Sequence, residues 1–140
     1  MKSNLEIQLR YSDTDQMGVI YHANYFSFYE QARTNFLKEL GYDYHEIERN
    51  GIIFPIREVS NTYLKSIRYG EKITVSTILA SVSKIKITYY HEIHNSEGEL
   101  KSKGYTTVVC VDKETFQVVK MDERLPKIYQ KYQDLMVKDS

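Results

Sequence analysis

The sequence predicts an α+β domain, in which an antiparallel sheet of about five strands wraps around one long central helix and a short C-terminal helix closes the chain. Two observations support this fold class. Residues 24–40 repeat apolar side chains every three or four positions, and the chain after them is rich in β-branched and aromatic residues joined by short turns. No linker, repeat or low-complexity segment divides the sequence, so we expect residues 1–140 to form a single domain.

The first strand and the central helix differ in period. In residues 4–11 apolar and polar side chains alternate, which is the two-residue period of a half-buried strand. In residues 24–40 the apolar stripe covers most of the circumference of a helix, and Gly41 follows as a C-terminal cap. We therefore expect a strand, a turn and then a buried helix.

The rest of the chain is mostly strand. Strand-forming residues dominate four segments, residues 52–69, 73–83, 84–94 and 100–111. A further short strand is expected at residues 116–120, and residues 122–136 form a small amphipathic helix with Pro126 in its first turn. The edge strands of such a sheet carry unpaired backbone groups, which favours a two-fold dimer with a second copy.

Composition excludes several classes of function. Lysine plus arginine and aspartate plus glutamate number 19 each, so no net field attracts the protein to nucleic acid. No segment approaches the roughly 20 apolar residues of a membrane span and the start lacks a signal-peptide core, so we expect a cytoplasmic protein. Cys110 is the single cysteine, which excludes an intrachain disulfide, and its apolar neighbours indicate a buried strand position.

Motifs for metal or nucleotide chemistry are not expected either. His91 and His94 lie three apart in a predicted strand, where they point to opposite faces and cannot share a metal ion. The sequence contains no glycine-rich phosphate loop and no serine nucleophile elbow. The acidic turn before the central helix therefore has no rival as a reactive site.

That turn places carboxylates near the start of a helix. Asp13 and Asp15 follow the first strand two residues apart, and Gly18 permits a left-handed turn. A helix N-terminus exposes N–H groups and a partial positive charge, so a carbonyl there would meet an oxyanion site beside a carboxylate. Aspartate in such a turn is also commonly an Asx-turn residue or a helix cap, and the residues alone leave both interpretations open.

The turn is part of a longer motif that resembles the signature of hotdog-fold acyl-CoA thioesterases, specifically the YbgC and 4-hydroxybenzoyl-CoA thioesterase group. The motif consists of Tyr11, Asp13, Asp15, Gly18, Tyr21, His22, Asn24 and Tyr25, followed by Tyr29, Glu30, Ala32 and Arg33. A fainter likeness continues to about residue 120. The resemblance implies a hotdog fold, two chains paired edge to edge into one sheet, tetramers of two dimers, and active sites at the dimer interface.

The same resemblance implies catalytic roles. Asp15 is the catalytic carboxylate, either as a nucleophile or as a general base on water, and Asp13 is structural. A main-chain N–H near His22 holds the thioester oxygen, and the part played by the imidazole of His22 stays open. We expect Tyr29 to pack in the core, while Glu30 and Arg33 lie at the spacing of an ordinary helical ion pair.

Binding residues are expected around this turn and on the later strands. The residues expected to line or orient the acyl pocket are Gly18, Tyr21, Asn24, Tyr25 and Phe54. Lys84 and Lys86 are candidates for holding the phosphates of coenzyme A, with ordinary solvated lysines as the alternative. Coenzyme A is part of the substrate, so no separate cofactor and no metal are expected.

The resulting expectation is an acyl-CoA thioesterase that works as a homodimer or as a tetramer of two dimers. The alternative is a non-catalytic module of the same fold that binds acyl-CoA or acyl carrier protein. The sequence does not fix the preferred acyl group, because that depends on the shape of the pocket.

Overall fold

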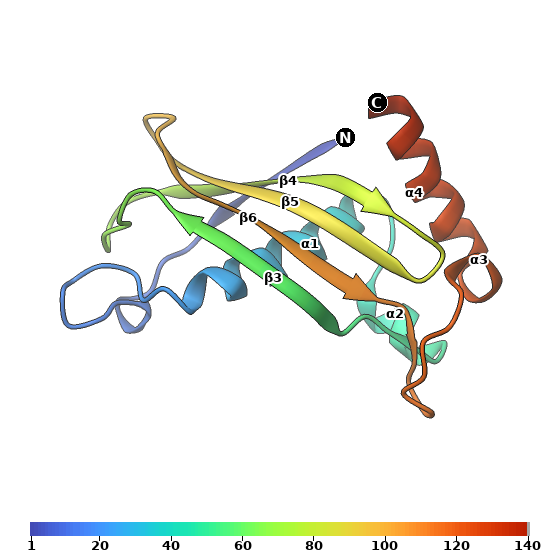
Figure 1. The fold of residues 1–140 in the computed structure, drawn as a ribbon. Helices are drawn as coiled ribbons and strands as arrows, with labels where there is room; N and C mark the ends of the chain where they lie inside the picture. Colours follow the sequence, from blue (N-terminus) through green and yellow to red (C-terminus); the bar gives the residue numbers. More distant parts are fainter. Residues whose placement is uncertain (140) are drawn as a thin grey trace.

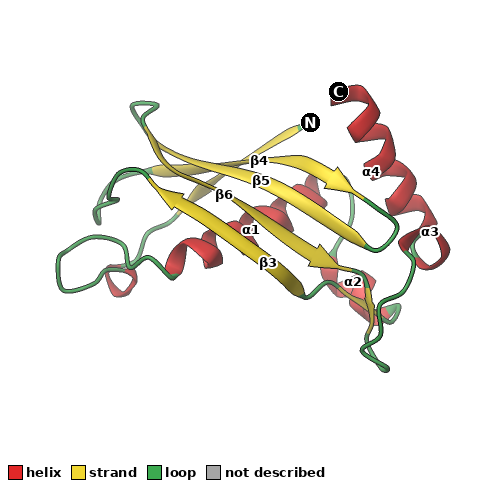
Figure 2. Cartoon of the chain, in the orientation of Figure 1, coloured by secondary structure: helices red, strands yellow, loops and turns green. Residues whose placement is uncertain are grey.

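The structure, a computed structural model, describes residues 1–139, without the side chains of residues 138 and 139. Its main feature is a five-stranded antiparallel sheet in the order β1-β4-β5-β6-β3, which curves over the helix α1 (Asn24–Glu39) (Figure 1). The strands are β1 (Lys2–Ile7), β3 (Ile56–Tyr63), β4 (Ile73–Val82), β5 (Lys86–Asn95) and β6 (Leu100–Val109). Helix α1 lies against one face of this sheet (Figure 2). The predicted α+β architecture is therefore confirmed.

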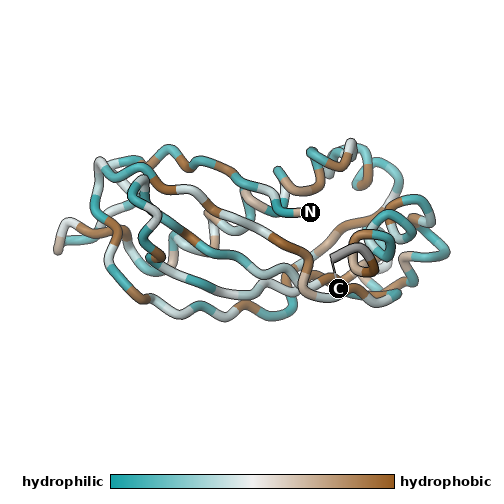
Figure 3. Tube along the Cα trace, turned by 90° about the horizontal axis from the view of Figure 1, so that it is seen from above, coloured by the Kyte–Doolittle hydropathy of each residue, from teal (hydrophilic) through white to brown (hydrophobic). Residues whose placement is uncertain are grey.

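The sheet contacts α1 through alternate residues of its central strands. Ile73, Val75, Thr77 and Leu79 of β4 are buried, whereas Thr74, Ser76 and Ile78 between them are more exposed, and Val75 pairs with Ile93 of β5. From above, hydrophobic and hydrophilic residues alternate along the strands (Figure 3). This period of two gives the sheet one apolar face, which the helix covers.

Helix α1 follows the predicted apolar period. Phe28, Tyr29, Ala32 and Phe36 are all buried on it, and Tyr29 is fully inaccessible, as expected of a core residue. The helix ends at Glu39 because Gly41 adopts a left-handed backbone with φ +93°, and its N–H donates to the carbonyl of Lys38 at 2.9 Å. The predicted C-terminal cap is confirmed.

The first strand ends earlier than predicted. β1 stops at Ile7, and Tyr11–Asp13 form a short 3-10 turn, η1, instead of continuing the strand. The Asp13 carboxylate accepts hydrogen bonds from the backbone N–H and the guanidinium of Arg10, at 2.9 and 3.0 Å. This closed turn competes with strand pairing for the same backbone groups.

The predicted strand over residues 52–69 is also wrong in extent. β2 (Ile52–Ile53) pairs with β7 (Val111–Asp112) in a separate two-stranded sheet, and Pro55, which has no N–H to donate, separates it from β3. Beyond Tyr63 the chain leaves the sheet, and residues 64–68 cross toward the loop before α1.

The chain contains short helices that the sequence did not reveal. The helix α2 (Tyr44–Arg49) is capped by Asp43, whose carboxylate accepts the N–H of His45 at 2.8 Å. The predicted C-terminal helix is two helices, α3 (Met121–Arg124) and α4 (Pro126–Asp139), and Pro126 opens the second. No helix of the described residues is long and apolar enough to cross a membrane.

The predicted strand at residues 116–120 does not form. Only a single bridge joins Val118 to Val111, and Phe116 has a left-handed backbone with φ 58°. The carboxylate of Asp112 accepts the N–H groups of Glu114 and Thr115, so a tight turn takes the place of a strand.

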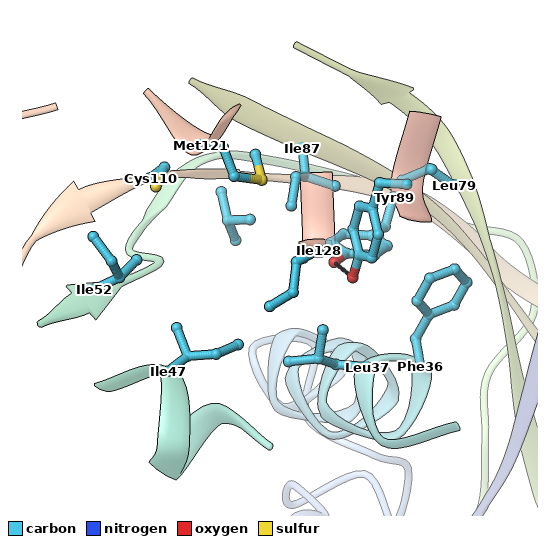
Figure 4. Close-up of a cluster of buried hydrophobic side chains, with 12 residues drawn as sticks. Phe36, Leu37, Ile47, Ile52, Leu79, Ile87, Tyr89, Cys110, Met121 and Ile128 are labelled. Atoms are coloured by element: carbon cyan, nitrogen blue, oxygen red, sulfur yellow. Dashed lines mark hydrogen bonds between the residues drawn. The ribbon is translucent and has the colours of Figure 1, made fainter. Parts of the chain in front are cut away.

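The core divides into two apolar clusters along α1. One surrounds the C-terminal half of the helix and includes Phe36, Leu37, Tyr89 and Cys110 (Figure 4). The other surrounds the N-terminal half. Cys110 is fully buried as predicted, and burial raises the pKa of its thiol to about 11, so this thiol is chemically inert at neutral pH.

Candidate active site

The loop between η1 and α1 folds back on itself. The N–H of Asp15 donates to the carbonyl of Val19 at 2.8 Å, and the N–H of Gly18 donates to the carbonyl of Asp15 at 3.1 Å. Gly18 has φ +78°, so the left-handed turn predicted there is present. The Asp15 carboxylate accepts the N–H of Met17 at 2.8 Å, so Asp15 is an Asx-turn residue in addition to any chemical role.

Asp13 fixes this loop to the start of α1. Its backbone carbonyl accepts the N–H of Tyr21 and the side-chain amide of Asn24, both at 2.8 Å. Burial raises the pKa of the Asp13 carboxyl, but its hydrogen bonds from Arg10 outweigh that effect and leave the pKa lowered. Asp13 is a buried anchor, as expected, and Asn24 positions the loop.

The start of α1 has free backbone donors. The capping residue Ala23 receives no side-chain cap, and no acceptor among residues 1–139 pairs with the N–H groups of His22 and Ala23. The Tyr63 hydroxyl donates to the carbonyl of His22 at 2.9 Å, which ties the helix start to the end of β3. A helix start with unpaired N–H groups suits a negative oxygen.

The helix start and Asp15 face one hollow of about 280 Å³, which we call the Asp15 hollow. Asp15, His22, Tyr25, Tyr63 and Lys65 all contribute to its wall. Asp15 is half-buried, and the rings of Tyr25 and Tyr63 meet edge to face, 4.8 Å between centroids. Burial raises the pKa of Tyr25 to about 12, so its hydroxyl stays protonated and can donate a hydrogen bond.

The segment that follows β3 forms the opposite wall of this hollow. Its N–H groups at Leu64 and Lys65 donate to the carbonyl of Lys101, and the carbonyl of Ile67 accepts the N–H of Ile20 at 2.7 Å. Ser66 of this wall is not predicted from the sequence. The adjacent polar residues Lys65 and Ser66 interrupt the alternation of a strand. This interruption is the feature of the sequence that indicates a segment outside the sheet.

Other predicted site residues lie elsewhere in the chain. Tyr21 is exposed and its ring lies 4.4 Å from that of His22, outside the Asp15 hollow. Lys84 lies 3.7 Å from the carboxylate of Asp122, and Lys86 is an exposed residue at the start of β5. In Figure 1 the start of β5 and the loop before α1 are at opposite ends of the sheet.

Phe54 lines a second hollow, of about 330 Å³, which we call the Arg33 hollow. Arg33 and Tyr44 share this wall, and the rings of Tyr44 and Phe54 are 6.2 Å apart. Arg33 is buried and forms no ion pair with Glu30 or with any other described residue, in contrast to the expected helical pair. Within one chain, the structure does not bring Phe54, Lys84 and Lys86 together with Asp15.

Among residues 1–139, no group of three or more histidine, cysteine, aspartate or glutamate side chains is arranged to hold a metal ion. Both ring nitrogens of the buried His91 are hydrogen-bonded, to the hydroxyls of Thr77 and Thr106 at 2.9 and 2.8 Å. His91 therefore has no free nitrogen for a ligand.

Comparisons with known proteins show the family of this chain. Residues 9–128 match the sequence model of the thioesterase-like superfamily. The putative acyl-CoA thioesterase YneP of Bacillus subtilis is 37% identical over 131 residues, 94% of this chain and 95% of that protein. The acyl-CoA thioester hydrolase YbgC of Escherichia coli is 31% identical over 106 residues, 76% of this chain and 79% of that protein.

A solved structure extends the likeness to three dimensions. The DHNA-CoA thioesterase of Staphylococcus aureus superposes with a TM-score of 0.96 and 37% identity, over 99% of this chain and 93% of that one. The whole fold described above, including the loop that carries Asp15, therefore has a counterpart in a solved thioesterase.

Proposed function

This chain belongs to the thioesterase-like superfamily, as an acyl-CoA thioester hydrolase with a hotdog fold, and from this premise we propose that Asp15 and the amides opening α1 form its catalytic centre. The observation that carries the proposal is the shared hollow: Asp15 and His22 line the same 280 Å³ space, with the unpaired N–H groups of the helix start beside it. A thioester there can meet a carboxylate and two backbone donors together.

The reaction follows from these groups. The thioester oxygen accepts the N–H of His22 or Ala23, and these donors stabilise the negative charge that develops on it; in other enzymes one such donor is worth about 100 to 1,000-fold in rate. As a general base, Asp15 takes a proton from water while the hydroxide attacks the carbonyl carbon, and the proton passes to the coenzyme A thiolate as the C–S bond breaks.

The nucleophilic route uses the same atoms in another order. An oxygen of Asp15 attacks the carbonyl carbon, the C–S bond breaks, and water then hydrolyses the resulting anhydride to the free acid. A single turnover in ¹⁸O-labelled water separates the routes. The general-base route puts the labelled oxygen into the first product acid and never into the enzyme, whereas in the nucleophilic route attack of water on the aspartyl carbonyl of the anhydride puts the label into the Asp15 carboxylate, so label found there identifies the nucleophilic route.

We propose that the functional unit is a dimer joined through β3. Every residue of this edge strand except Asn61 is exposed, and Ile56, Val59 and Tyr63 are apolar side chains at 46%, 41% and 44% exposure. A second copy pairing antiparallel with this edge would cover them and complete one continuous sheet. Two such dimers would form a tetramer, and light scattering would then give two or four times the chain mass of 16.6 kDa.

This pairing would bring separated site residues together. In an antiparallel pair about a two-fold axis, the Ile56 end of β3 lies beside the Tyr63 end of its partner. Tyr63 lines the Asp15 hollow and Phe54, just before Ile56, lines the Arg33 hollow. The dimer would therefore place the Phe54 wall of one chain next to the Asp15 hollow of the other.

We propose an aromatic acyl group as the substrate class, with DHNA-CoA, the substrate in the name of the Staphylococcus aureus enzyme, as the first compound to test. The aromatic walls formed by Tyr25, Tyr63, Tyr44 and Phe54 support this choice. Lys65 at the Asp15 hollow, with Lys84 and Lys86 from elsewhere in the assembly, would meet the phosphates of coenzyme A.

The decisive experiment is release of free coenzyme A by the wild type and by Asp15→Asn. The asparagine oxygen can still accept the N–H of Met17, so the fold is kept, and we expect the rate to fall at least about 100-fold. The matched control is Asp112→Asn, because Asp112 accepts the N–H of Glu114 in the same kind of turn, far from the hollow. Wild-type turnover in Asp15→Asn would overturn the mechanism, and binding of acyl-CoA without release by the wild type would favour the non-catalytic alternative.

A further inference from the structure

Arg33 is a buried cation without a protein partner. It is only 7% exposed, and among residues 1–139 no hydrogen bond or ion pair holds its guanidinium. Burial lowers the pKa of Arg33, which reflects the unfavourable removal of the charge from water. A buried arginine normally has a carboxylate, a phosphate or several oxygen acceptors around it. Arg33 instead lines the Arg33 hollow, so its missing partner has room to bind there.

The shape of this hollow indicates the kind of partner. Tyr44 and Phe54 meet edge to face at 6.2 Å, and the buried Ile52 lies in the same wall, so the hollow suits a flat apolar ring. Its volume of about 330 Å³ exceeds that of a small aromatic acyl group. A ring held between these side chains would present its substituents to the guanidinium.

The other charges of the hollow limit which anion fits. Glu30, Asp43 and Glu48 also line it, and all three are exposed at the rim while Arg33 is buried. Their negative charges oppose the entry of a free carboxylate, but they oppose a neutral hydroxyl much less. His45 is the remaining titratable group besides Tyr44 in this wall. A phenolic hydroxyl, which is neutral and whose oxygen can accept hydrogen bonds from the guanidinium, fits this balance of charges.

We propose that Arg33 is a specificity-determining residue that binds an acidic hydroxyl on an aromatic acyl group, while the thioester of the same substrate lies at Asp15 of the partner subunit. The inference rests on the proposed function and on the dimer through β3, which together join the two hollows into one site. It names a recognition group for the acyl part of the substrate, separate from the carboxylate and the amides that carry out the chemistry.

The test compares two substrates that differ by one hydroxyl. We use 4-hydroxybenzoyl-CoA, whose hydroxyl lies para to the thioester, and benzoyl-CoA, and measure kcat/KM for the wild type, Arg33→Met and Arg33→Lys. The ratio of the two kcat/KM values should fall about 10 to 100-fold in Arg33→Met, which is the usual worth of a hydrogen bond to a charged group. Arg33→Lys keeps the charge without the planar fork, so its ratio should lie between those of Arg33→Met and the wild type.

Arg49→Met is the matched control, because Arg49 is an exposed arginine on α2 whose only ion pair, with Glu46 at 3.9 Å, is on the surface. Its substrate ratio should equal that of the wild type. Urea unfolding and light scattering of each variant show whether the fold and the dimer persist.

Three results would overturn the proposal. An unchanged ratio in Arg33→Met would mean that the guanidinium does not meet the hydroxyl. An equal loss on both substrates would mean a structural role, and dissociation of the Arg33→Met dimer would mean that an acid of the second copy is its partner. Failure of the proposed function is a different outcome, because then the wild type would cleave neither compound, or Asp15→Asn would cleave both.

Discussion

The two ends of α1 differ in how they are closed. At the C-terminal end, Gly41 caps the last turn, and an apolar cluster with Phe36 at its centre packs the helix against β5 and α4. At the N-terminal end, Ala23 provides no side-chain cap, the N–H groups of His22 and Ala23 have no acceptor among the described residues, and His22 lines the Asp15 hollow. The C-terminal end of α1 is therefore capped and packed, whereas the N–H groups at its N-terminal end have no acceptor among the described residues.

Under the proposed function, stability and chemistry are divided between the opposite ends of this helix. An uncapped helix start costs about 1 kcal/mol relative to a good cap, and a well-packed cluster at the other end offsets this several times over. The helix start is held by its hydrogen bonds to Asp13 and Tyr63 and by the apolar cluster around its N-terminal half, so the open amides are fixed in place without being paired. Such preorganised donors are what a reaction with a developing oxyanion needs.

The largest expected effect comes from removing a packed ring at the C-terminal end of α1. The ring of Phe36 meets Tyr89 and Tyr132 edge to face, at 5.4 and 6.0 Å, and it is fully buried. Phe36→Ala should lower the free energy of unfolding by about 3 to 5 kcal/mol, measured by urea denaturation. The comparison variant is Phe26→Ala, at a partly buried position near the open end, which should cost clearly less. Equal losses would contradict the asymmetry of the helix.

The helix could be predicted from the sequence because the features that define it are close together in the chain. The apolar period of residues 24–40 and the glycine at position 41 are both local, and the structure reproduces the helix to within one residue. The turn at Gly18 is local in the same sense. Asp15 could therefore be placed beside the helix start before the fold was known, because only a few residues separate the two.

The walls of the site depended on contacts between distant segments. The bond from the N–H of Ile20 to the carbonyl of Ile67 joins residues 64–68 to the loop before α1, and the polar pair Lys65-Ser66 is the local pattern that hints at this departure from the sheet. Phe54, Lys84 and Lys86 were expected near Asp15, and within one chain they are not, because their distance from Asp15 is set by the path of the whole sheet and not by local spacing. The short helix α2 has too few residues to give a clear period.

Between the two ends of α1 lies a layer of buried polar side chains. The ring of His91 stacks on Tyr29, 4.4 Å between centroids, and its nitrogens are bonded to Thr77 and Thr106. Burial, followed by the charge of Arg33, lowers the pKa of His91 to about 3. His91 is therefore neutral in the folded protein. In the unfolded chain its imidazole has the ordinary pKa of about 6.5 and takes up a proton below that pH.

This layer gives a prediction of intermediate size. The free energy of unfolding should fall as the pH drops below about 6.5, by up to about 1.4 kcal/mol per pH unit from His91 alone, until the pH nears the folded pKa. The measurement is urea denaturation at pH 7.5, 6 and 5, for the wild type and for His91→Gln, which does not titrate. A difference between the two proteins that stays constant with pH would contradict the assignment.

The smallest expected effect concerns the open end. Tyr63→Phe removes the hydroxyl that donates to the carbonyl of His22 at 2.9 Å but keeps the ring that packs against Tyr25. Because the bond is single and exposed, unfolding should lose only about 0.5 to 1.5 kcal/mol. The free amides of His22 and Ala23 are held by the same turn, so kcat should fall more than KM rises, since misplaced donors affect the transition state first. The control is Tyr69→Phe, an exposed tyrosine whose ring contacts Tyr11 outside the hollow. A rise in KM with unchanged kcat would place Tyr63 in ground-state binding and would leave the helix start fixed by packing alone.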